Sequence, residues 1–223
     1  MARSKKDFTL REKKYAKTKI ALANEFMARM KTTRLSEISI KEVCQKVEIS
    51  EGTFYNYFPH KIDLACYFNK FTLLKLVWEI EKNKELDSLQ KIRYVFDVLA
   101  DDIPAPFAFY EIISLYTSEQ IRPDKTEDLT PAEKVYGLPD CPGVEEINIL
   151  SLEDFLAQLV SFAQKEKLLS ADISVDDIVL SLMSTIIGIP LAIDIKDFKK
   201  IKKLYRSQLS LLWKGLGIKR KKQ

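Results

Sequence analysis

Histidine and cysteine are scarce in this sequence of 223 residues. The single histidine is His60, and the three cysteines, Cys44, Cys66 and Cys141, are far apart and form no C-x-x-C pair. A structural zinc site needs about four clustered nitrogen or sulfur ligands. We therefore expect no metal and no cofactor. An odd number of cysteines is typical of a protein from a reducing compartment.

Common catalytic motifs are also missing. The sequence contains no G-x-x-x-x-G-K-[ST] phosphate loop, no H-E-x-x-H and no G-x-S-x-G, which are the patterns of several large enzyme classes. A histidine-based triad has only His60 available, and a residue at a helix start after Pro59 is more often a cap. We expect no catalytic residue and no enzyme activity.

Long apolar runs and helix breakers are few. No run reaches the ~20 residues that span a bilayer, and the opening MARSKKDFTLREKKYAK lacks the apolar stretch of a signal peptide. We expect a cytoplasmic protein without a membrane segment. Only six glycines and eight prolines interrupt a chain that is 46% hydrophobic, which favours long elements around a real core.

The apolar pattern predicts an all-α protein, because strand-like alternation is absent and helical spacing recurs. Ile20, Ala23, Met27 and Met30 form one such stripe. Predicted helices cover 11–31, 39–47, 50–58, 60–80, 87–102, 104–118, 147–168, 173–193 and 196–214. Residues 119–146 hold four prolines and two glycines, so we expect a long, functional loop with a short helix over 130–136.

Residues 38–68 predict a helix-turn-helix. Ser39, with Glu42 three residues on, has the capping-box pattern, Ser50 caps the next short helix, and Pro59 ends it. In such motifs the second helix enters the DNA major groove with its N-terminal residues facing base edges.

The side chains of this second helix suit that role. Those at its start are small or polar, and a helix N-terminus favours an anionic phosphate; Phe54 and Phe58 are spaced to anchor the helix to a core. Candidate DNA contacts are Ser50, Glu51, Gly52, Thr53, Tyr55, Asn56, Tyr57 and Lys61. Residues 1–66 contain 14 Lys and Arg against 8 Asp and Glu, whereas the remainder contains 22 against 24. Alone, this excess of positive charge is usually a solvated face.

The string GTFYNYFPHKIDL closely resembles the TetR-family signature, roughly G-T-hydrophobic-Y-x-[HY]-F-x-x-K-x-x-L, and IKEVCQKVEIS resembles that family's first motif helix and turn. The resemblance covers about residues 16–68. It implies DNA contacts from Lys41 and Thr53, base-edge positions for Glu51, Gly52 and Asn56, and phosphate contacts from Ser39, Tyr55, Tyr57 and Lys61. It also implies a DNA-binding domain over 1–60 and a helical effector-binding and dimerisation domain over 61–223.

Two features depart from the family pattern. Glu48 stands where the turn usually has glycine, so we expect either a strained backbone or a slightly different chain path there, and MKTTRLSE lacks the usual glycine and is longer. The basic residues Arg3, Lys5 and Lys6 are candidates for a minor-groove arm, with a solvated tail as the alternative.

The resemblance implies a cavity for a small, mostly apolar ligand in the larger domain. Such pockets are lined by apolar and aromatic side chains with a few polar groups. Most of the aromatic residues there are ordinary core; the candidate ligand contacts are Trp78, Phe96, Phe107, Tyr110 and Tyr116.

The two long helices predicted after the loop, 147–168 and 173–193, predict a homodimer. VLSLMSTIIGIPLAI, residues 179–193, is apolar on almost every side, and a helix of that kind must be buried all round. A four-helix bundle about a two-fold axis would bury it, with Phe155, Leu159, Ile186 and Ile189 at the interface. The alternative is a central helix covered by the final helix.

Three functions stay open at this point. The first is a ligand-responsive regulator, expected to be a repressor that releases double-stranded DNA when the ligand binds. The second is a helix-turn-helix regulator controlled by a protein partner, which a pocketless core would favour. The third, an all-helical enzyme, has no motif in its support.

Overall fold

The computed structural model describes residues 8–101, 109–111, 113–114, 128–148, 151–193 and 195–216, Ile195 by its backbone only. All regular elements in these ranges are helical, as the sequence predicts. The chain forms two compact units: Met1–Glu79 with Pro104–Ile149, and Ile80–Ile103 with Leu150–Gln223. These units are defined by packing and not by function. The predicted boundary between a DNA-binding domain and an effector domain at residue 60 therefore stays a prediction.

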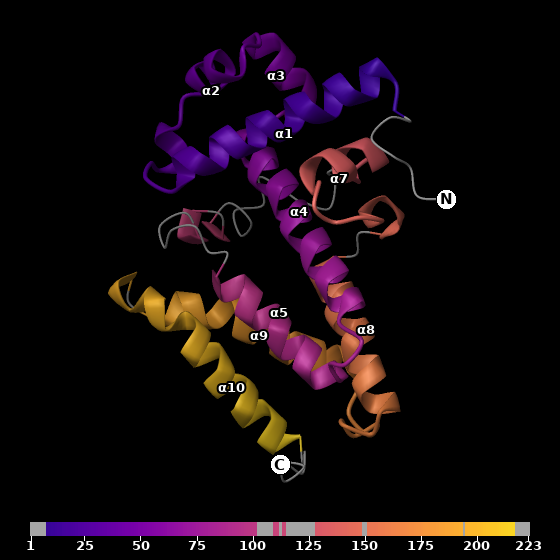
Figure 1. Cartoon of the computed structure of the whole chain (residues 1–223). Helices are drawn as coiled ribbons and strands as arrows, with labels where there is room; N and C mark the ends of the chain where they lie inside the picture. The colour runs from indigo at the N-terminus through magenta and orange to yellow at the C-terminus, as the bar shows by residue number, and fades with distance from the viewer. Residues whose placement is uncertain are drawn as a thin grey trace. The chain divides into compact units, whose positions relative to one another are not determined.

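The first unit begins with helix α1 (Leu10–Met30), the 3-10 helix η1 (Leu35–Glu37) and helices α2 (Ile40–Val47), α3 (Glu51–Tyr57) and α4 (Lys61–Lys82), the last of which crosses into the second unit (Figure 1). Thr9 and Glu12 form a complete capping box at the start of α1. The predicted stripe of α1 is largely inward, because Ala23, Met27 and Met30 are buried.

The capping box predicted for α2 is only half formed. The Ser39 hydroxyl accepts the Glu42 N–H at 3.3 Å, as expected. The Glu42 carboxylate instead accepts from Arg29 Nη1 at 2.6 Å, while Arg29 Nε donates to Glu25 at 2.8 Å. A charged partner outcompetes the backbone N–H, so Glu42 ties α2 to α1.

Residues 128–148 form a structured end to the region predicted as a loop. Helix α7 (Pro131–Gly137) starts at the Thr130 cap, which confirms the short helix predicted there, and η3 (Val144–Glu146) follows. In Figure 1 α7 lies beside the N-terminal half of α1, against which it packs. Phe8 and Ala16 are buried in one apolar cluster with Ala132 and Val135.

The second unit contains α5 (Ser88–Asp101), α8 (Leu152–Lys165), α9 (Val175–Ala192), the 3-10 helix η4 (Ile195–Lys200) and α10 (Ile201–Gly215). Helix α5 packs on α8 and α10, and α9 packs on the same two helices. Helix α8 is shorter than predicted because Ser151 caps it and Lys167 adopts a left-handed conformation just after it. Of the helix predicted over 104–118, the described residues 109–111 and 113–114 are helical, and the rest lies outside the described residues.

Pro190 interrupts the hydrogen bonding of α9. It has no N–H to donate to the carbonyl of Ile186, four residues earlier. The Tyr205 hydroxyl of α10 donates to that carbonyl at 2.7 Å, and its ring packs edge-on against Phe96 of α5 with centroids 5.3 Å apart. Burial raises the pKa of Tyr205, so the phenol stays protonated as the donor.

Candidate nucleic-acid interface

The start of α3 combines a satisfied helix cap with exposed polar side chains. Ser50 Oγ accepts the Thr53 N–H at 3.1 Å and lies 2.9 Å from Thr53 Oγ1. Ser50, Glu51 and Gly52 are exposed, as are Tyr55 and Asn56 farther along, whereas Thr53 is half-buried. Most of the contacts predicted from this helix therefore reach solvent.

Gly52 has no packing reason to be glycine. A Cβ built on it would meet only Ser50 Oγ, at an ordinary 3.8 Å. Glycine in a helix costs roughly 0.5–1 kcal/mol relative to alanine. A residue that lowers stability without serving the fold is typical of a position where another molecule approaches the backbone closely.

The turn between α2 and α3 has a strained backbone at Glu48, which is one of the two alternatives expected from the missing glycine. Glu48 has φ 60° and ψ 43°, the left-handed conformation that favours glycine. The N–H of Ile49 donates to the Cys44 carbonyl at 3.0 Å and the N–H of Glu48 to Gln45 at 3.3 Å. This pair of bonds is a Schellman motif, and it ends α2 sharply enough for a three-residue turn.

The inner side of α3 is anchored by aromatic residues. Phe54 is fully buried and Phe58 is 3% exposed, as predicted, with ring centroids 6.0 Å apart. Tyr57 is half-buried and packs edge-on against Tyr15 of α1 at 5.1 Å. On α2 Lys41 is exposed and Ser39 is half-buried. The candidate DNA contacts of α3 thus sit on a helix whose other face is fixed to the core.

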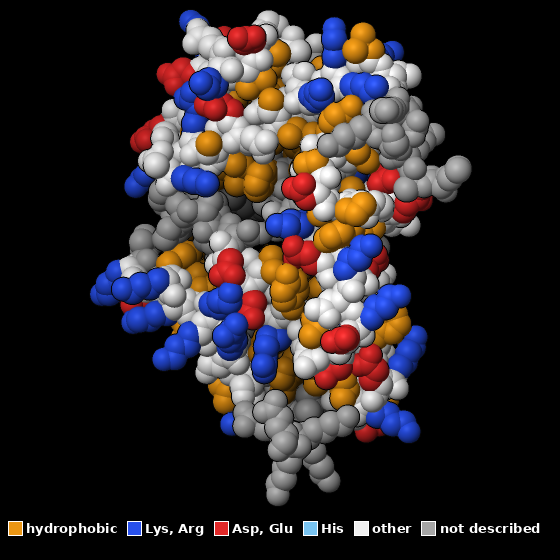
Figure 2. Space-filling view, in the orientation of Figure 1, with side chains coloured by type: hydrophobic (Ala, Val, Ile, Leu, Met, Phe, Trp, Pro, Cys, Tyr) orange, Lys and Arg blue, Asp and Glu red, His pale blue; other side chains and the backbone are white. Residues whose placement is uncertain are grey.

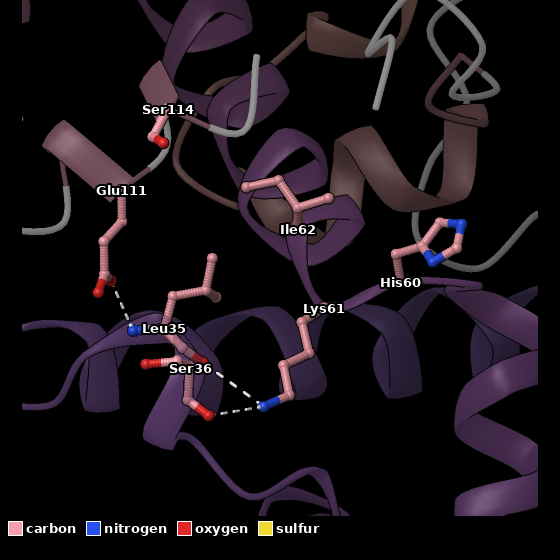
Figure 3. Close-up of a pocket in the computed structure, with 7 residues that line it drawn as sticks. All are labelled: Leu35, Ser36, His60, Lys61, Ile62, Glu111 and Ser114. Carbon is pink, nitrogen blue, oxygen red and sulfur yellow. Dashed lines mark hydrogen bonds between the residues drawn. The ribbon is translucent and has the colours of Figure 1, made fainter. Parts of the chain in front are cut away.

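Lys61 contacts protein rather than open solvent in this structure. Its Nζ donates to the carbonyls of Leu35 at 3.5 Å and Ser36 at 3.4 Å, and Glu111 accepts the Leu35 N–H at 2.6 Å (Figure 3). These residues line a pocket of about 360 Å³ together with His60, Ile62 and Ser114. The phosphate contact implied for Lys61 requires this side chain to leave its long hydrogen bonds.

Charged and titratable side chains of both signs lie around the motif helices. Figure 2 shows Lys and Arg side chains among acidic ones over α1–α3. Burial raises the pKa of the Cys44 thiol, which makes a nucleophilic thiolate unfavourable. Among the described residues no group of three His, Cys, Asp or Glu side chains is arranged to ligate a metal.

The three predicted ligand contacts that the structure describes, Trp78, Phe96 and Tyr110, do not line the pocket beside Lys61. Phe96 is fully buried against Tyr205. Trp78 is half-buried and donates from Nε1 to the Pro142 carbonyl at 3.1 Å, and Tyr110 is half-buried beside Phe109. Phe107 and Tyr116 lie outside the described residues. The apolar ligand cavity stays a prediction.

The predicted dimer residues are mostly buried within one chain. Phe155 and Leu159 are 5% and 4% exposed, Ile186 is 9% exposed, and Ile189 is half-buried. The same two helices expose other large apolar side chains, namely Phe162, Leu180, Ile187 and Leu191. Helices α8 and α9 turn the predicted residues toward the core of their own unit and leave the second set exposed. Helical spacing alone does not specify which of the two faces points inward.

Helix α9 also meets the length and hydropathy criteria for a membrane span, the one helix of the described chain that does. The core helix of a soluble protein meets the same criteria, and α9 packs on α8 and α10. Only 28% of the helix is buried in this chain, so much of its apolar surface is exposed here.

Two residues that sequence reasoning missed are Lys19 and Glu133. Both are buried, and their side chains form an ion pair of 2.9 Å between α1 and α7. The pattern Thr130-Pro131-x-Glu133 is typical of the capping box that forms there. Nothing in the sequence indicates that the same carboxylate also meets a lysine 114 positions earlier.

These features define an all-α architecture in which a helix-turn-helix and a second helical unit share one chain. No protein-family model and no curated protein matches the sequence. Solved structures match over most of its length. A structure described as a TetR-family transcriptional regulator from Rhodococcus sp. is 12% identical, with 89% of this chain and 97% of that chain covered and a TM-score of 0.60.

Two further structures extend the comparison. A transcriptional regulator from Cytophaga hutchinsonii is 12% identical, covers 87% of this chain and 96% of its own, and has a TM-score of 0.54. The ketosteroid transcriptional regulator KstR2 of Mycobacterium tuberculosis is 11% identical, with coverages of 89% and 94% and a TM-score of 0.50. At such identities the similarity establishes the fold. The fold of this chain is that of the TetR-family regulators, as its signature predicts.

Proposed function

We propose that this protein is a DNA-binding transcription regulator. The observation that carries the proposal is the recognition helix α3, whose apolar side is anchored by the buried Phe54 while Glu51, Tyr55 and Asn56 face solvent. A helix of this kind presents its N-terminal residues to base edges in the major groove. The TetR fold and the structures of transcription regulators that share it support the same function.

The proposed DNA contacts divide by role. Lys41 and the half-buried Lys61 are cations that would meet phosphates, which set the position of a protein on the duplex. Glu51 and Asn56 would meet base edges, which carry the sequence information. Gly52 would let the backbone of α3 approach the duplex, in keeping with the free space around it.

The proposed assembly is a homodimer built on α8 and α9. Leu180, Ile187 and Leu191 lie at positions i, i+7 and i+11 of α9, which places them along one face, and all three are exposed. A second copy related by a two-fold axis would bury this face in a four-helix bundle. A dimer would also present two recognition helices to a palindromic site.

We further propose that a small, mostly apolar ligand lowers DNA affinity, which would make the protein a ligand-responsive repressor in the cytoplasm. A ligand that binds the folded chain raises its melting temperature by mass action. A broad screen of apolar compounds by thermal shift, followed by DNA binding with each hit, tests this. The absence of any hit would favour control by a protein partner instead.

Phosphate contacts test the DNA-binding proposal itself. Lys41→Ala should weaken binding to a duplex retained by the wild-type protein and reduce the slope of log affinity against log salt by about one. Lys199→Ala, which removes another exposed lysine, on η4, is the matched control and should change neither. Binding that is independent of salt, or unaltered by Lys41→Ala, would contradict the proposed interface.

A further inference from the structure

Glu133 is a buried carboxylate, and both of its oxygens have partners. Its Oε2 accepts the Thr130 N–H at 2.7 Å, which completes the cap of α7. Its Oε1 accepts the Tyr67 hydroxyl of α4 at 2.9 Å and lies 2.9 Å from Lys19 Nζ of α1. The residue is 1% exposed, so one side chain joins three helices without solvent.

Lys19 lies among aromatic rings on its other sides. Its Nζ is 4.5 Å from the ring centroid of Tyr67, 5.0 Å from Tyr15 and 5.4 Å from Phe58. Rings at these distances attract a cation through their quadrupole, more strongly where water is excluded. Because Lys19 is only 7% exposed, the carboxylate of Glu133 is its compensating charge.

These rings continue to the recognition helix. Phe58 directly follows the last residue of α3, and Tyr15 packs edge-on against Tyr57, that last residue, with centroids 5.1 Å apart. A chain of contacts therefore runs from Glu133 through Lys19 and Tyr15 to Tyr57. This chain links the Tyr57 ring to an ion pair whose acidic partner belongs to a segment more than 70 residues later.

We propose that Glu133 is a positioning residue for DNA binding, acting through Lys19 and Tyr15 on Tyr57. The proposal rests on the proposed DNA-binding function. It gives α7, a helix remote in sequence from the motif, a role in holding the end of α3 in place. The hydrogen-bond and ion-pair partners of Glu133 lie on α1, on α4 and at the cap of α7. Glu133 fixes the lysine whose charge orients the rings on which the end of α3 packs.

The docking of α7 does not rest on Glu133 alone, which makes the idea testable. Ala132 and Val135 pack with Phe8 and Ala16 in an apolar cluster, and Gly137 lies directly against the Phe71 ring of α4. Glu133→Gln removes the charge but keeps one acceptor oxygen for the Thr130 N–H, and its amide NH2 can donate to the Tyr67 hydroxyl in place of the lost acceptor. The variant thus separates the ion pair from the packing of α7.

The experiment follows Tyr57 directly in the full chain. Protein labelled with 3-fluorotyrosine gives a fluorine resonance for Tyr57, assigned by its loss in Tyr57→Phe. It is compared between wild type, Glu133→Gln and Lys19→Met/Glu133→Gln, in which the buried charge is removed from both partners. Tyr205→Phe, which removes a buried hydrogen bond in the other unit, is the control for stability loss alone.

We expect the Tyr57 resonance to shift or broaden in both charge variants and to stay unchanged in Tyr205→Phe. Affinity for a duplex retained by the wild-type protein should fall about tenfold in Glu133→Gln, the scale of one charged hydrogen bond. The fall should be smaller in the double variant, because no unpaired ammonium is left. The salt slope should equal that of wild type, because no phosphate contact is lost.

An unchanged Tyr57 resonance in folded Glu133→Gln would overturn the proposal. If that variant does not fold, an unchanged resonance in the double variant overturns it equally. Failure of the wild-type protein to bind any duplex would reject the proposed function instead, and the fluorine spectrum would still decide whether Glu133 positions Tyr57.

Discussion

At the scale of single residues, a substitution of Gly52 should change stability and DNA binding in opposite directions. Gly52→Ala should stabilise the folded chain by up to about 1 kcal/mol, because alanine favours a helix and its Cβ meets no close atom. The same methyl group should weaken DNA binding if the backbone of α3 approaches the duplex. Urea unfolding and a DNA titration on one preparation measure both; a variant that is more stable and binds DNA equally well would remove Gly52 from the interface.

Tyr205 compensates for the N–H that Pro190 lacks, and this too has a measurable consequence. Tyr205→Phe should lower the free energy of unfolding by about 1–3 kcal/mol, because the buried Ile186 carbonyl loses its donor. Tyr55→Phe, which loses an exposed hydroxyl, should be nearly neutral.

A double-mutant cycle isolates the cause. In a Pro190→Ala background, residue 190 supplies its own N–H to the Ile186 carbonyl, so the loss from Tyr205→Phe should shrink. An equal loss in both backgrounds would show that the hydroxyl acts elsewhere.

Local chemistry explains which residue roles could be predicted. Ser50 and Thr130 are caps because a hydroxyl before a helical pattern accepts a backbone N–H, and the strain at Glu48 follows from the missing glycine. The capping box predicted from Ser39 and Glu42 is only half confirmed, because the Glu42 carboxylate binds Arg29. Arg29 lies 13 residues away, and only the folded chain brings it close. The Lys19–Glu133 pair is a tertiary fact with no local signal.

At the scale of elements, the turn between α2 and α3 is strained but well bonded. Glu48→Gly should stabilise the chain by about 1 kcal/mol, because glycine adopts the left-handed conformation without a Cβ penalty. Part of that gain is offset by the greater freedom of glycine in the unfolded chain.

The comparison is thermal or chemical unfolding of Glu48→Gly beside Glu48→Ala. Alanine has the Cβ but no charge, so it should show little gain. Equal stabilisation by both variants would point to the charge of Glu48 rather than to its backbone.

Helix existence was predictable along most of the described chain, and helix ends were less so. Residues 173–193 were predicted as a helix and α9 spans Val175–Ala192, because Ser174 caps it and Pro190 lies too near its end to divide it. Residues 196–200 were predicted as part of the last helix but form a 3-10 helix. The spacing of apolar residues does not distinguish a short 3-10 helix from the first turn of an α-helix.

At the scale of the whole molecule, the exposed face of α9 predicts the assembly. Ile187→Glu should yield monomers, because it places a charge in the proposed interface, while the fold of each chain persists since Ile187 is 37% exposed. Leu159→Glu should instead unfold the chain, because Leu159 is 4% exposed.

Sedimentation and circular dichroism together distinguish these outcomes. Leu211→Glu, on an exposed leucine of α10 outside the proposed face, is the control and should leave the dimer intact. A wild-type protein that is monomeric at micromolar concentration, or a dimeric Ile187→Glu variant, would contradict the proposed interface.

The central claim is that this chain recognises a DNA sequence as a dimer through α3. Its most direct test is to sequence the duplexes that the wild-type protein retains from a random pool. We expect enrichment of a palindrome whose half-sites lie about one helical turn apart. A retained pool with no enriched sequence would contradict the account.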